Sequence, residues 1–309
     1  MTAATIVPTS DRADWLAKRR TGIGASDIAA IMGVSPWSTP LQVWVSKVSD
    51  DAPETDMSED MLWGARMEAL ILDEFEQRQH DLPLYNRGAL WRNEERPFML
   101  ATPDAVTDHR TLGQMPVEAK KVDAWNWDDG IPDYYQMQVQ WQMAVLGAPR
   151  GFLVALHRGR RLEIYPLEAD PELQAAMITA AEGFWGMVEQ EIPPPAQGED
   201  SAFLNSLYPT HIEEAVEVAP EIASELRLAK DTMNQAKSRL AAAEAALKEI
   251  MGEADTAVVG QDVVATWRTQ TTRRFDLKRF KAEDPDTVEL FTKPSSSRVL
   301  RVKAAKDDQ

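Results

Sequence analysis

Two segments near the middle of the chain restrict its fold more than any other part of the sequence. Residues 98–108 and residues 117–121 are typical of two strands joined by a turn, which Gly113 marks. Side chains alternate between the two faces of a strand, so Glu118 and Lys120 share one face and their neighbours share the other. We therefore expect a strand pair that carries charged residues at the edge of a sheet.

The acidic residues of this strand pair predict a metal-dependent site. Asp104 comes within reach of Glu118 and Lys120. Two carboxylates suit a hard divalent cation such as Mg²⁺, which takes oxygen ligands. A neighbouring lysine can orient a water and stabilise developing phosphate charge. Many strands end in an acid, so a surface Glu–Lys pair is the alternative, and the rest of the chain has to decide between the two.

The composition limits which other chemistries are open. The chain has no cysteine, which excludes disulfides, thiolate zinc sites, iron–sulfur clusters and cysteine nucleophiles. Its histidines form no ligand pair at helical spacing. No apolar run approaches the roughly 18 residues that span a bilayer, and the first residues lack the features of a signal peptide. We expect a cytoplasmic protein without a membrane partner. The formal charge of −17 argues against tight nonspecific DNA binding, although a local basic groove can still bind DNA.

Two predicted helices bring further polar side chains toward the strand pair. In the helix predicted over residues 59–79, Glu68 shares a face with apolar residues such as Leu72. An acid on a buried face is costly unless it is paired or bound to metal, which makes Glu68 a third candidate carboxylate. A partly exposed glutamate at the edge of the apolar stripe is the alternative. In the helix predicted over residues 132–147, the Gln140 amide lies beside the apolar face and is expected to point inward.

A glycine-rich segment near the start of the chain is a candidate anion site. Two glycines lead into Ser26 and Asp27, which are good N-caps for the apolar helical run that follows. A helix N-terminus offers free N–H groups and a positive dipole end to a phosphate, and Arg19 and Arg20 lie just upstream. An ordinary capped helix without a ligand is the alternative. Elsewhere, Trp125 lies in a loop rich in Asp and Gly, where it can stack on bases or pack under the loop.

The order of the predicted elements indicates an α/β fold. A run of helices is followed by three strands, a helix, a hairpin and a closing helix, which suggests a mixed central sheet flanked by helices. A proline-rich linker at residues 191–200 marks a domain boundary, so we expect domains over 1–200 and 201–309. The predicted segments that complete the first domain are a strand at 84–92, a hairpin at 151–157 and 161–166, and a helix at 170–190.

The C-terminal domain is predicted to contain one long helix and a small basic α+β segment. Apolar positions alternate in steps of four and three between residues 226 and 250, which is a heptad seam on a helix of about 213–253. Such a seam must pack against its own C-terminal segment, the rest of the body or another chain. A hairpin at 256–267 and a final strand follow. Residues 267–303 hold ten Lys or Arg against five Asp or Glu, so they can contact DNA or an acidic partner, or form a solvated face.

Taken together, these segments resemble the YqaJ viral recombinase family, relatives of phage lambda exonuclease within the PD-(D/E)xK nuclease superfamily. The resemblance covers about residues 12–190, and it implies a PD-(D/E)xK nuclease core followed by the long helix and the small extension. Ala105 departs from the family, which commonly has glycine there, and its methyl group can shift Asp104 slightly. The matching motifs are Arg19-Arg-Thr-Gly-Ile-Gly-Ala-Ser-Asp-Ile, Ser35-Pro-Trp, Trp63-Gly-Ala-Arg-Met-Glu, Thr102-Pro-Asp-Ala, Val117-Glu-Ala-Lys and Gln138-Val-Gln.

The resemblance also implies an activity and partners. It implies a Mg²⁺-dependent 5′→3′ exonuclease, with Mn²⁺ as a substitute metal, that acts on the ends of linear double-stranded DNA. The 3′ overhangs would be loaded with a single-strand annealing protein for phage-type homologous recombination. The protein would be a homo-oligomer encoded by a phage or prophage and present in the cytoplasm of a bacterial host.

Each site residue receives a role from its position in the matching motifs. Asp104, Glu118 and the carbonyl of Ala119 would ligate the metal, and Lys120 would position the attacking water. The metal and water network would be completed by Glu68 and Gln140. The terminal 5′ phosphate would be held by Arg20, Ser26 and Thr102, with Arg19 adjacent.

Two other functions remain open at this point. A structure-specific or site-specific endonuclease can use the same scaffold, because fold does not fix function, and nicking of closed circles would identify it. A non-catalytic protein that binds DNA ends, with the long helix as its working part and a degenerate site, is the second alternative. The intact set of Asp104, Glu118 and Lys120 weighs against it.

Overall fold

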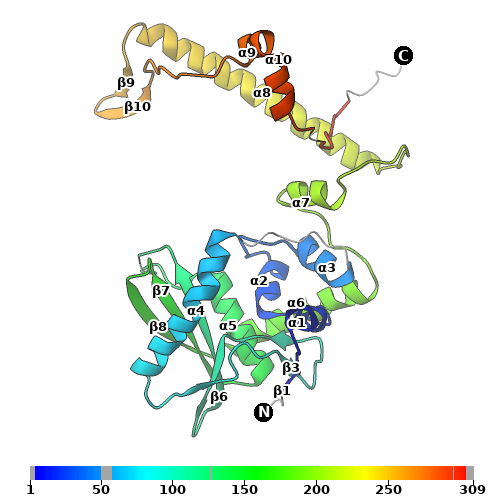
Figure 1. The fold of residues 1–309 in the computed structure, drawn as a ribbon, viewed down its shortest axis with the longest axis vertical. Coiled ribbons are helices and arrows are strands. Elements are labelled where there is room, and N and C mark those ends of the chain that lie inside the picture. Colours follow the sequence, from blue (N-terminus) through cyan, green and yellow to red (C-terminus); the bar gives the residue numbers. More distant parts are fainter. Residues whose placement is uncertain (1–3, 50–57, 126, 295, 304–309) are drawn as a thin grey trace. The chain divides into compact units, whose positions relative to one another are not determined.

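The computed structural model describes residues 4–49, 58–125, 127–294 and 296–303. The chain divides into two compact units, Met1–Leu207 and Tyr208–Gln309 (Figure 1). The division falls after Leu207 rather than after residue 200, because the carboxylate of Asp200 is buried in the first unit and accepts a hydrogen bond from the Thr39 hydroxyl.

The first unit has the mixed α/β fold that the element order predicts. Its helices are α1 (Arg12–Arg19), α2 (Ala25–Ile31), α3 (Pro40–Val48), α4 (Glu59–Arg78), α5 (Asp133–Leu146), α6 (Pro171–Glu189) and α7 (Asp200–Leu207). Its strands are β1 (Ala4–Ile6), β2 (Leu84–Tyr85), β3 (Trp91–Asn93), β4 (Leu100–Ala101), β5 (Ala105–His109), β6 (Gly113–Val122), β7 (Arg150–His157) and β8 (Arg161–Glu168).

The strands form two sheets in the first unit. The larger sheet has the order β2-β5-β6-β7-β8, and the smaller has the order β1-β3-β4. Strand β6 runs parallel to β7, whereas β5 pairs with β6 and β7 pairs with β8 in the antiparallel sense, so the larger sheet is mixed. Helix α5 connects β6 to β7, because two parallel neighbours need a crossover rather than a tight turn.

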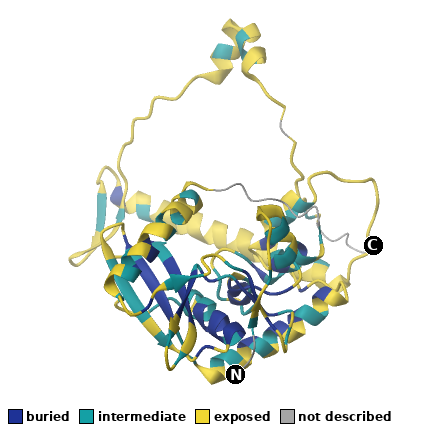
Figure 2. Cartoon of the chain, turned by 60° about the horizontal axis from the view of Figure 1, so that its bottom comes forward, coloured by how far each residue is buried: buried dark blue, intermediate teal, exposed yellow. Residues whose placement is uncertain are grey.

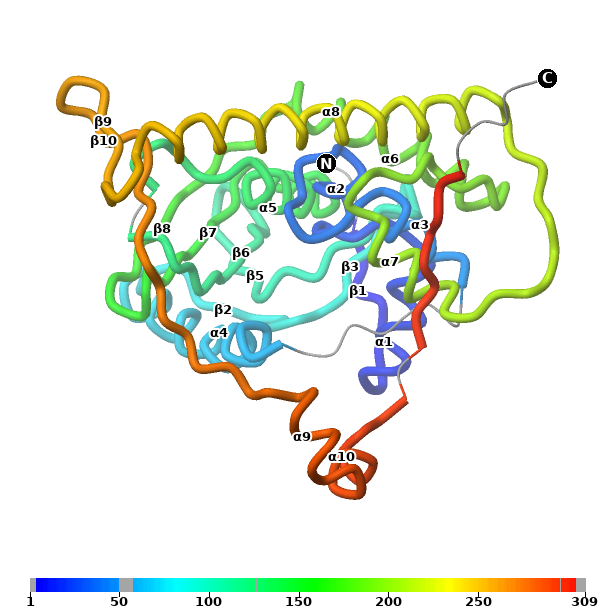
Figure 3. Tube along the Cα trace, turned by 90° about the horizontal axis from the view of Figure 1, so that it is seen from above, coloured from blue at the N-terminus to red at the C-terminus, as the bar shows by residue number. Residues whose placement is uncertain are grey.

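Helices α4 and α5 cover opposite faces of the larger sheet (Figures 1 and 3). On one face, Leu72 and Phe75 of α4 belong to the buried cluster that contains Val117 of β6. On the other face, Val139 of α5 belongs to the buried cluster that contains Leu153 of β7. Figure 2 shows the inner strands and the sheet-facing sides of these helices as buried. The central strands therefore carry buried apolar side chains on both faces, as expected for a sheet covered by helices on each side.

The single strand expected over residues 84–92 is wrong, because two short strands in different sheets occupy this range. Strand β2 pairs with β5, whereas β3 pairs with β1 and β4. Asn86 and Gly88, with φ of 50° and 64°, lie between the two strands in the left-handed region and turn the chain from one sheet to the other.

The second unit consists of α8 (Pro220–Met251), the hairpin β9 (Thr256–Val259) and β10 (Asp262–Thr266), and the short helices α9 (Leu277–Glu283) and α10 (Pro285–Phe291). The long helix begins at Pro220 rather than near residue 213, because proline suits the first helical position and disrupts a helix interior. The described residues 296–303 do not form the expected final strand. Among the described residues, no helix is long and apolar enough to cross a membrane.

Candidate active site

The predicted carboxylate and lysine residues meet where β5 begins beside β6. The backbone N–H of Ala119 donates to Asp104 Oδ2 at 2.7 Å, which fixes the carboxylate against the middle of β6. Lys120 Nζ lies 2.5 Å from Glu118 Oε1. Glu118 and Lys120 face α5 while Val117 and Ala119 pack toward α4, in agreement with the strand alternation.

Helix α5 supplies two amides that hold Glu118 in place. Glu118 is only 2% exposed, and an unpaired buried carboxylate would be very costly. Gln138 Nε2 donates to Glu118 Oε1, and Gln142 Nε2 donates to Glu118 Oε2 at 2.7 Å. Together with Lys120, these donors satisfy both oxygens and fix the orientation of the carboxylate.

Gln140 does not reach this cluster, which corrects the expected position of its amide. Its Nε2 donates to the carbonyl of Glu168 at 2.7 Å, and its Oε1 accepts from the N–H of Asp170 at 3.0 Å. Two residues along a helix rotate a side chain by about 200°, so Gln140 faces away from Gln138 and Gln142, which lie one turn apart on a common face. The spacing of four between Gln138 and Gln142 indicates in the sequence that these two share a face, but it does not indicate that Glu118 lies on that side.

The pKa values of Asp104 and Lys120 are both raised in this cluster, but for different reasons. Burial raises the pKa of Asp104, and the negative charges of Glu118 and Glu68 raise it further, although Lys120 opposes them. Burial lowers the pKa of Lys120, but Glu118 and Asp104 outweigh it, so the net pKa is raised. The ammonium group of Lys120 therefore stays charged. Additional positive charge near Asp104 would favour the ionised form of its carboxyl group.

Glu68 lies on α4 at the border of the same charged neighbourhood. It is half-buried, and both burial and the charge of Glu118 raise its pKa. No group of three or more acidic or histidine side chains is arranged to hold a metal ion in the part of the chain that the structure describes. The pair of Asp104 and Glu118 nevertheless fits a hard divalent cation, because it offers buried oxygen donors whose mutual repulsion a cation would relieve.

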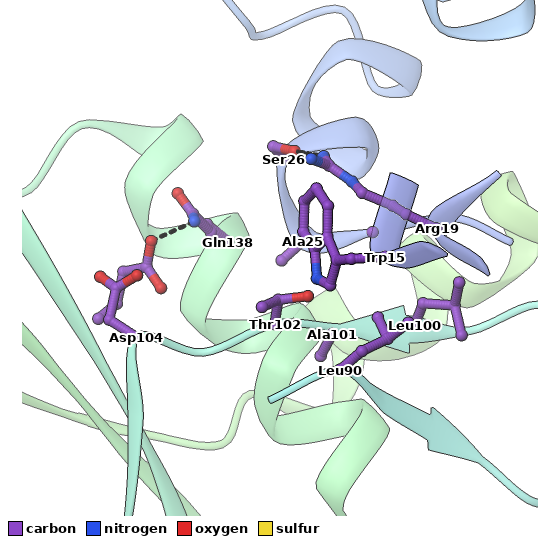
Figure 4. A pocket seen from close by; sticks show the side chains of 12 residues that line it. Trp15, Arg19, Ala25, Ser26, Leu90, Leu100, Ala101, Thr102, Asp104 and Gln138 are labelled. Atoms are coloured by element: carbon purple, nitrogen blue, oxygen red, sulfur yellow. Dashed lines mark hydrogen bonds between the residues drawn. The ribbon is translucent and has the colours of Figure 1, made fainter. Parts of the chain in front are cut away.

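A pocket extends from the carboxylates to the glycine-rich segment (Figure 4). Asp104 and Gln138 line one part, and Thr102 lies between them and the other side chains. Glu118, which accepts from Gln138, is also part of the lining. At the far part, the Arg19 guanidinium donates to Ser26 Oγ. Basic and hydroxyl side chains thus share one cavity with the acidic cluster.

The backbone explains why two distant segments of the sequence line one pocket. The N–H of Ile23 donates to the carbonyl of Phe98 at 2.7 Å, and the N–H of Leu100 donates to the carbonyl of Ile23 at 2.9 Å. A Cβ atom on Gly22 would lie 2.4 Å from the carbonyl oxygen of Phe98, so only glycine permits this approach. The indole N–H of Trp141 donates to the Ile23 carbonyl at 3.2 Å and secures the contact from α5.

Arg20 is not among the residues that line the pocket, which corrects the expected pairing with Ser26 and Thr102. One Nη of Arg20 donates to the carbonyl of Ser49 at 2.7 Å. Arg19, one residue earlier, lines the pocket. Consecutive residues at a helix end point in directions about 100° apart, so a sequence pattern alone does not tell which of two adjacent arginines faces a site.

The start of α2 also differs from the expected capping. Gly24 is the N-cap, and the Asp27 carboxylate accepts from the N–H of Gly24 at 2.9 Å. Burial raises the pKa of Asp27, but Lys47 at 2.7 Å and Arg19 at 3.3 Å lower it to about 2. A permanent carboxylate therefore occupies the positive end of this helix, and the pocket depends on the Arg19 side chain for positive charge.

Trp125 lies outside the pocket, in the loop that follows β6. Its side chain is 60% exposed and lies near two guanidinium groups, with Arg158 at 4.3 Å and Arg160 at 5.9 Å from the ring centroid. The tip of the β7–β8 hairpin carries both arginines. The predicted role of Trp125 in DNA binding stays a prediction.

The chain is similar to one protein family and to one curated relative, and both carry the name YqaJ. Residues 14–149 match the model of the YqaJ-like viral recombinase domain. A relative from Bacillus subtilis (strain 168), described as uncharacterized protein YqaJ, is 28% identical over an alignment of 306 residues, and the match covers 94% of this chain and 94% of the relative.

Among solved structures, similarity is found to LHK-Exo, an alkaline exonuclease from Laribacter hongkongensis, including its complex with dAMP. That match has 18% identity and a TM-score of 0.49 over 59% of this chain and 94% of the other. A phage-related exonuclease from Haemophilus somnus 129PT matches with 13% identity and a TM-score of 0.39, over 55% of this chain and 96% of the other.

Proposed function

From the premise that this chain carries a YqaJ-like viral recombinase domain, we propose that it is a metal-dependent deoxyribonuclease acting 5′→3′ on the ends of linear double-stranded DNA. The observation that carries the proposal is that Asp104 and Glu118 line one pocket with Arg19 and Ser26, while Lys120 contacts Glu118 at 2.5 Å. Carboxylates for a cation and basic or hydroxyl groups for a phosphate are the two requirements for hydrolysing a phosphodiester at a strand end.

The carboxylates are the groups that would hold the cation, and the amides of α5 would keep Glu118 in place. Asp104 and Glu118 supply the ligands, and the carbonyl of Ala119 and the carboxylate of Glu68 are further ligands that the family resemblance adds. Mg²⁺ is the proposed ion, with Mn²⁺ as a substitute. When bound, the cation would polarise the phosphodiester and lower the pKa of the attacking water.

Lys120, which contacts Glu118, would act directly on the phosphate. Its ammonium group stays charged because two carboxylates surround it. A fixed cation next to the reacting phosphate orients the water and stabilises the negative charge that develops during hydrolysis. The Glu118 carboxylate, in turn, keeps Lys120 in this position through the contact at 2.5 Å.

The remainder of the pocket suits the terminal 5′ phosphate. Arg19 can donate two hydrogen bonds to a phosphate, and the hydroxyl groups of Ser26 and Thr102 can donate one each. An enzyme that needs this contact would act from a 5′ end and leave a 3′ overhang. By resemblance, the overhang would be passed to a single-strand annealing protein in a bacterial host, and the enzyme would work as a homo-oligomer.

Degradation of defined DNA substrates tests the proposal. We expect Mg²⁺-dependent loss of 5′-phosphorylated linear duplex, slower loss of the 5′-hydroxyl form, no loss in EDTA and no change in covalently closed circles. Nicked circles would instead indicate an endonuclease. If no substrate is cleaved with Mg²⁺ or Mn²⁺, the proposal is wrong and a DNA-end binding protein is the remaining reading.

Two arginine variants test whether the pocket binds the 5′ phosphate. Arg19→Ala should remove the preference for a 5′ phosphate, because the guanidinium that would contact it is gone. Arg92→Ala is a suitable control, because Arg92 is an exposed arginine on β3 that does not line the pocket. An unchanged phosphate preference in the Arg19 variant would remove this residue from the proposed site.

A further inference from the structure

Three aromatic side chains lie together beside the candidate active site, and the proposed function does not use them. Trp37 lies edge-on against Tyr134, with ring centroids 4.7 Å apart and planes at 80°. Tyr134 in turn contacts Tyr135, with centroids 4.4 Å apart. We call Trp37, Tyr134 and Tyr135 the aromatic row. It joins the turn before α3 to the first turn of α5.

The aromatic row leads directly to the acidic cluster. Lys120 Nζ lies 5.8 Å from the centroid of the Tyr135 ring. Tyr134 precedes Gln138 by four residues, so it lies one turn, or about 6 Å, further along the same face of α5. That face holds Glu118 through Gln138 and Gln142. One row of side chains on α5 therefore runs from the two glutamines that hold Glu118 to Tyr134, which contacts the exposed Trp37.

Trp37 is exposed although its backbone is fixed. The side chain is 65% exposed, which leaves much of the largest apolar side chain in contact with water. The Ser35 hydroxyl accepts hydrogen bonds from the N–H groups of Trp37 at 3.2 Å and Ser38 at 3.3 Å. Thr39 then caps α3 through the N–H of Gln42 at 3.2 Å. The turn therefore holds Trp37 in a fixed position and leaves its ring open to solvent. Such a ring is suited to contact a ligand rather than to pack in the core.

We propose that the aromatic row is a stacking site for an unpaired nucleobase of the DNA strand whose phosphate lies at Asp104, Glu118 and Lys120. The inference rests on the proposed function and adds to it a contact with the base. A planar base matches an exposed indole, and stacking on aromatic rings tolerates any base because each has a π face. The chain is strongly acidic, so a contact that does not depend on positive charge is of particular use for holding DNA here.

Binding of short DNA strands without turnover tests the inference. The probes are 5′-phosphorylated single-stranded oligonucleotides of about eight nucleotides, in which one abasic nucleotide is moved stepwise inward from the 5′ end. Fluorescence anisotropy in EDTA gives the Kd of each for the full chain and for Trp37→Ala, Trp37→Phe and Trp63→Ala. Trp63 is a matched control, because it is an exposed tryptophan at 44% on α4 whose ring contacts Arg66 rather than the aromatic row.

We expect one abasic position to weaken binding of the unmodified chain by roughly 5- to 150-fold, the range that stacking of one base supplies. Trp37→Ala should weaken binding of the intact strand by a similar factor and no longer respond to the missing base. Trp37→Phe should keep most of the affinity, and Trp63→Ala all of it. The inference is overturned if Trp37→Ala binds as the unmodified chain does, or if it loses the same factor on intact and abasic strands.

Hydrolysis of linear duplex with Mg²⁺, measured on the same preparations, separates this inference from the proposed function. An unmodified chain that cleaves DNA, together with unchanged binding by Trp37→Ala, contradicts the stacking site alone. An unmodified chain that does not cleave but senses the missing base through Trp37 contradicts the hydrolysis alone. Absence of both oligonucleotide binding and duplex cleavage overturns both proposals.

Discussion

Lys120 is the residue on which the proposed chemistry depends most directly, because of its ammonium group. Replacing it with alanine removes the cation between Asp104 and Glu118 and the group that would stabilise phosphate charge. We expect Lys120→Ala to lower the cleavage rate on the order of 10²- to 10³-fold, the usual cost of losing one preorganised donor. Single-turnover cleavage of linear duplex measures the rate, and circular dichroism verifies the fold. Unchanged cleavage in the folded variant would refute the site assignment.

Asp104 gives a prediction that involves metal and pH instead of rate. Its pKa in the folded protein is raised by burial and by neighbouring carboxylates. The folded state therefore holds the proton more tightly than the unfolded state, so stability falls as pH rises from the ordinary aspartate pKa through the raised one. In EDTA, Asp104→Asn should lack this loss and melt at a higher temperature than the unmodified chain at neutral pH.

Addition of Mg²⁺ should reverse the order of the two proteins. The cation relieves the repulsion in the unmodified chain and stabilises it by mass action, whereas Asp104→Asn has lost a ligand. Thermal melts of both proteins with and without Mg²⁺, at acidic and neutral pH, measure the effect. Equal Mg²⁺-dependent shifts in the two proteins would show that Asp104 is not a ligand.

At the scale of elements, α5 carries glutamines in two different roles. Gln142 holds Glu118, whereas Gln140 contacts the backbone of Glu168 and Asp170. Gln142→Met keeps the volume of a buried side chain but removes a donor to Glu118, so we expect cleavage to slow by roughly ten-fold, or about 1.4 kcal/mol in the barrier. Gln140→Met removes hydrogen bonds to the backbone of Glu168 and Asp170, so it should lower the free energy of unfolding by about 1–3 kcal/mol. Cleavage should be nearly unchanged in Gln140→Met.

Cleavage rates and urea unfolding of these two variants give the required readouts. Gln142→Asn, with a shorter amide, should show partial activity if the role of Gln142 is to position Glu118. If both methionine variants lose cleavage in proportion to their stability, α5 has only a structural role.

The contrast between β6 and α5 shows which parts of the site the sequence could predict. The face of Glu118 and Lys120 follows from the two-residue period of a strand, which needs no tertiary information. The inward direction of Gln140 was predicted correctly, but two faces of α5 are buried, and only one of them meets Glu118. Choosing between them requires knowing that β6 lies on one side and the β8–α6 connection, with Glu168 and Asp170, lies on the other.

The same distinction applies to the segments at 19–27 and 84–92. The glycines near residue 22 signal a close approach, but the partner is Phe98, which is distant in the sequence. The apolar residues at 84–92 are typical of a strand, yet Asn86 and Gly88 divide them between two sheets. Local patterns thus predicted the elements, whereas the partners of each element depend on long-range contacts that propensity does not contain.

At the scale of the whole molecule, the contacts of Asp200 show where the first unit ends, and the proposed site lies wholly within that unit. The Asp200 carboxylate accepts hydrogen bonds from Thr39 and from the N–H of Gln197 at 2.7 Å, so α7 is part of the first unit. Every residue of the proposed site lies before Leu207. A chain that ends after residue 207 should therefore keep its fold, its metal response and its cleavage of short duplexes.

Helix α8 gives the second unit a different role. In α8, Leu226, Met233 and Leu240 of the heptad seam are exposed within their own unit at 41%, 46% and 60%. Among the described residues, Leu300, Arg301 and Val302 line a pocket with the first part of the seam, around Met233. A helix of 32 residues with an exposed seam is normally stabilised by a partner. We therefore expect removal of residues 208–309 to reduce self-association of the chain, while the cleavage rate per active site stays within about two- to three-fold, the precision to which distant sites act independently.

Light scattering of the full chain and of residues 1–207, over the same range of concentrations, measures the association state. A full-length chain with Leu240→Glu, which places a charge in the seam without shortening the protein, should match the truncated chain in its number of subunits. If the truncated chain folds and loses all cleavage of short duplexes, the second unit takes part in the chemistry. If neither variant differs from the full chain in its number of subunits, the seam serves something other than self-association.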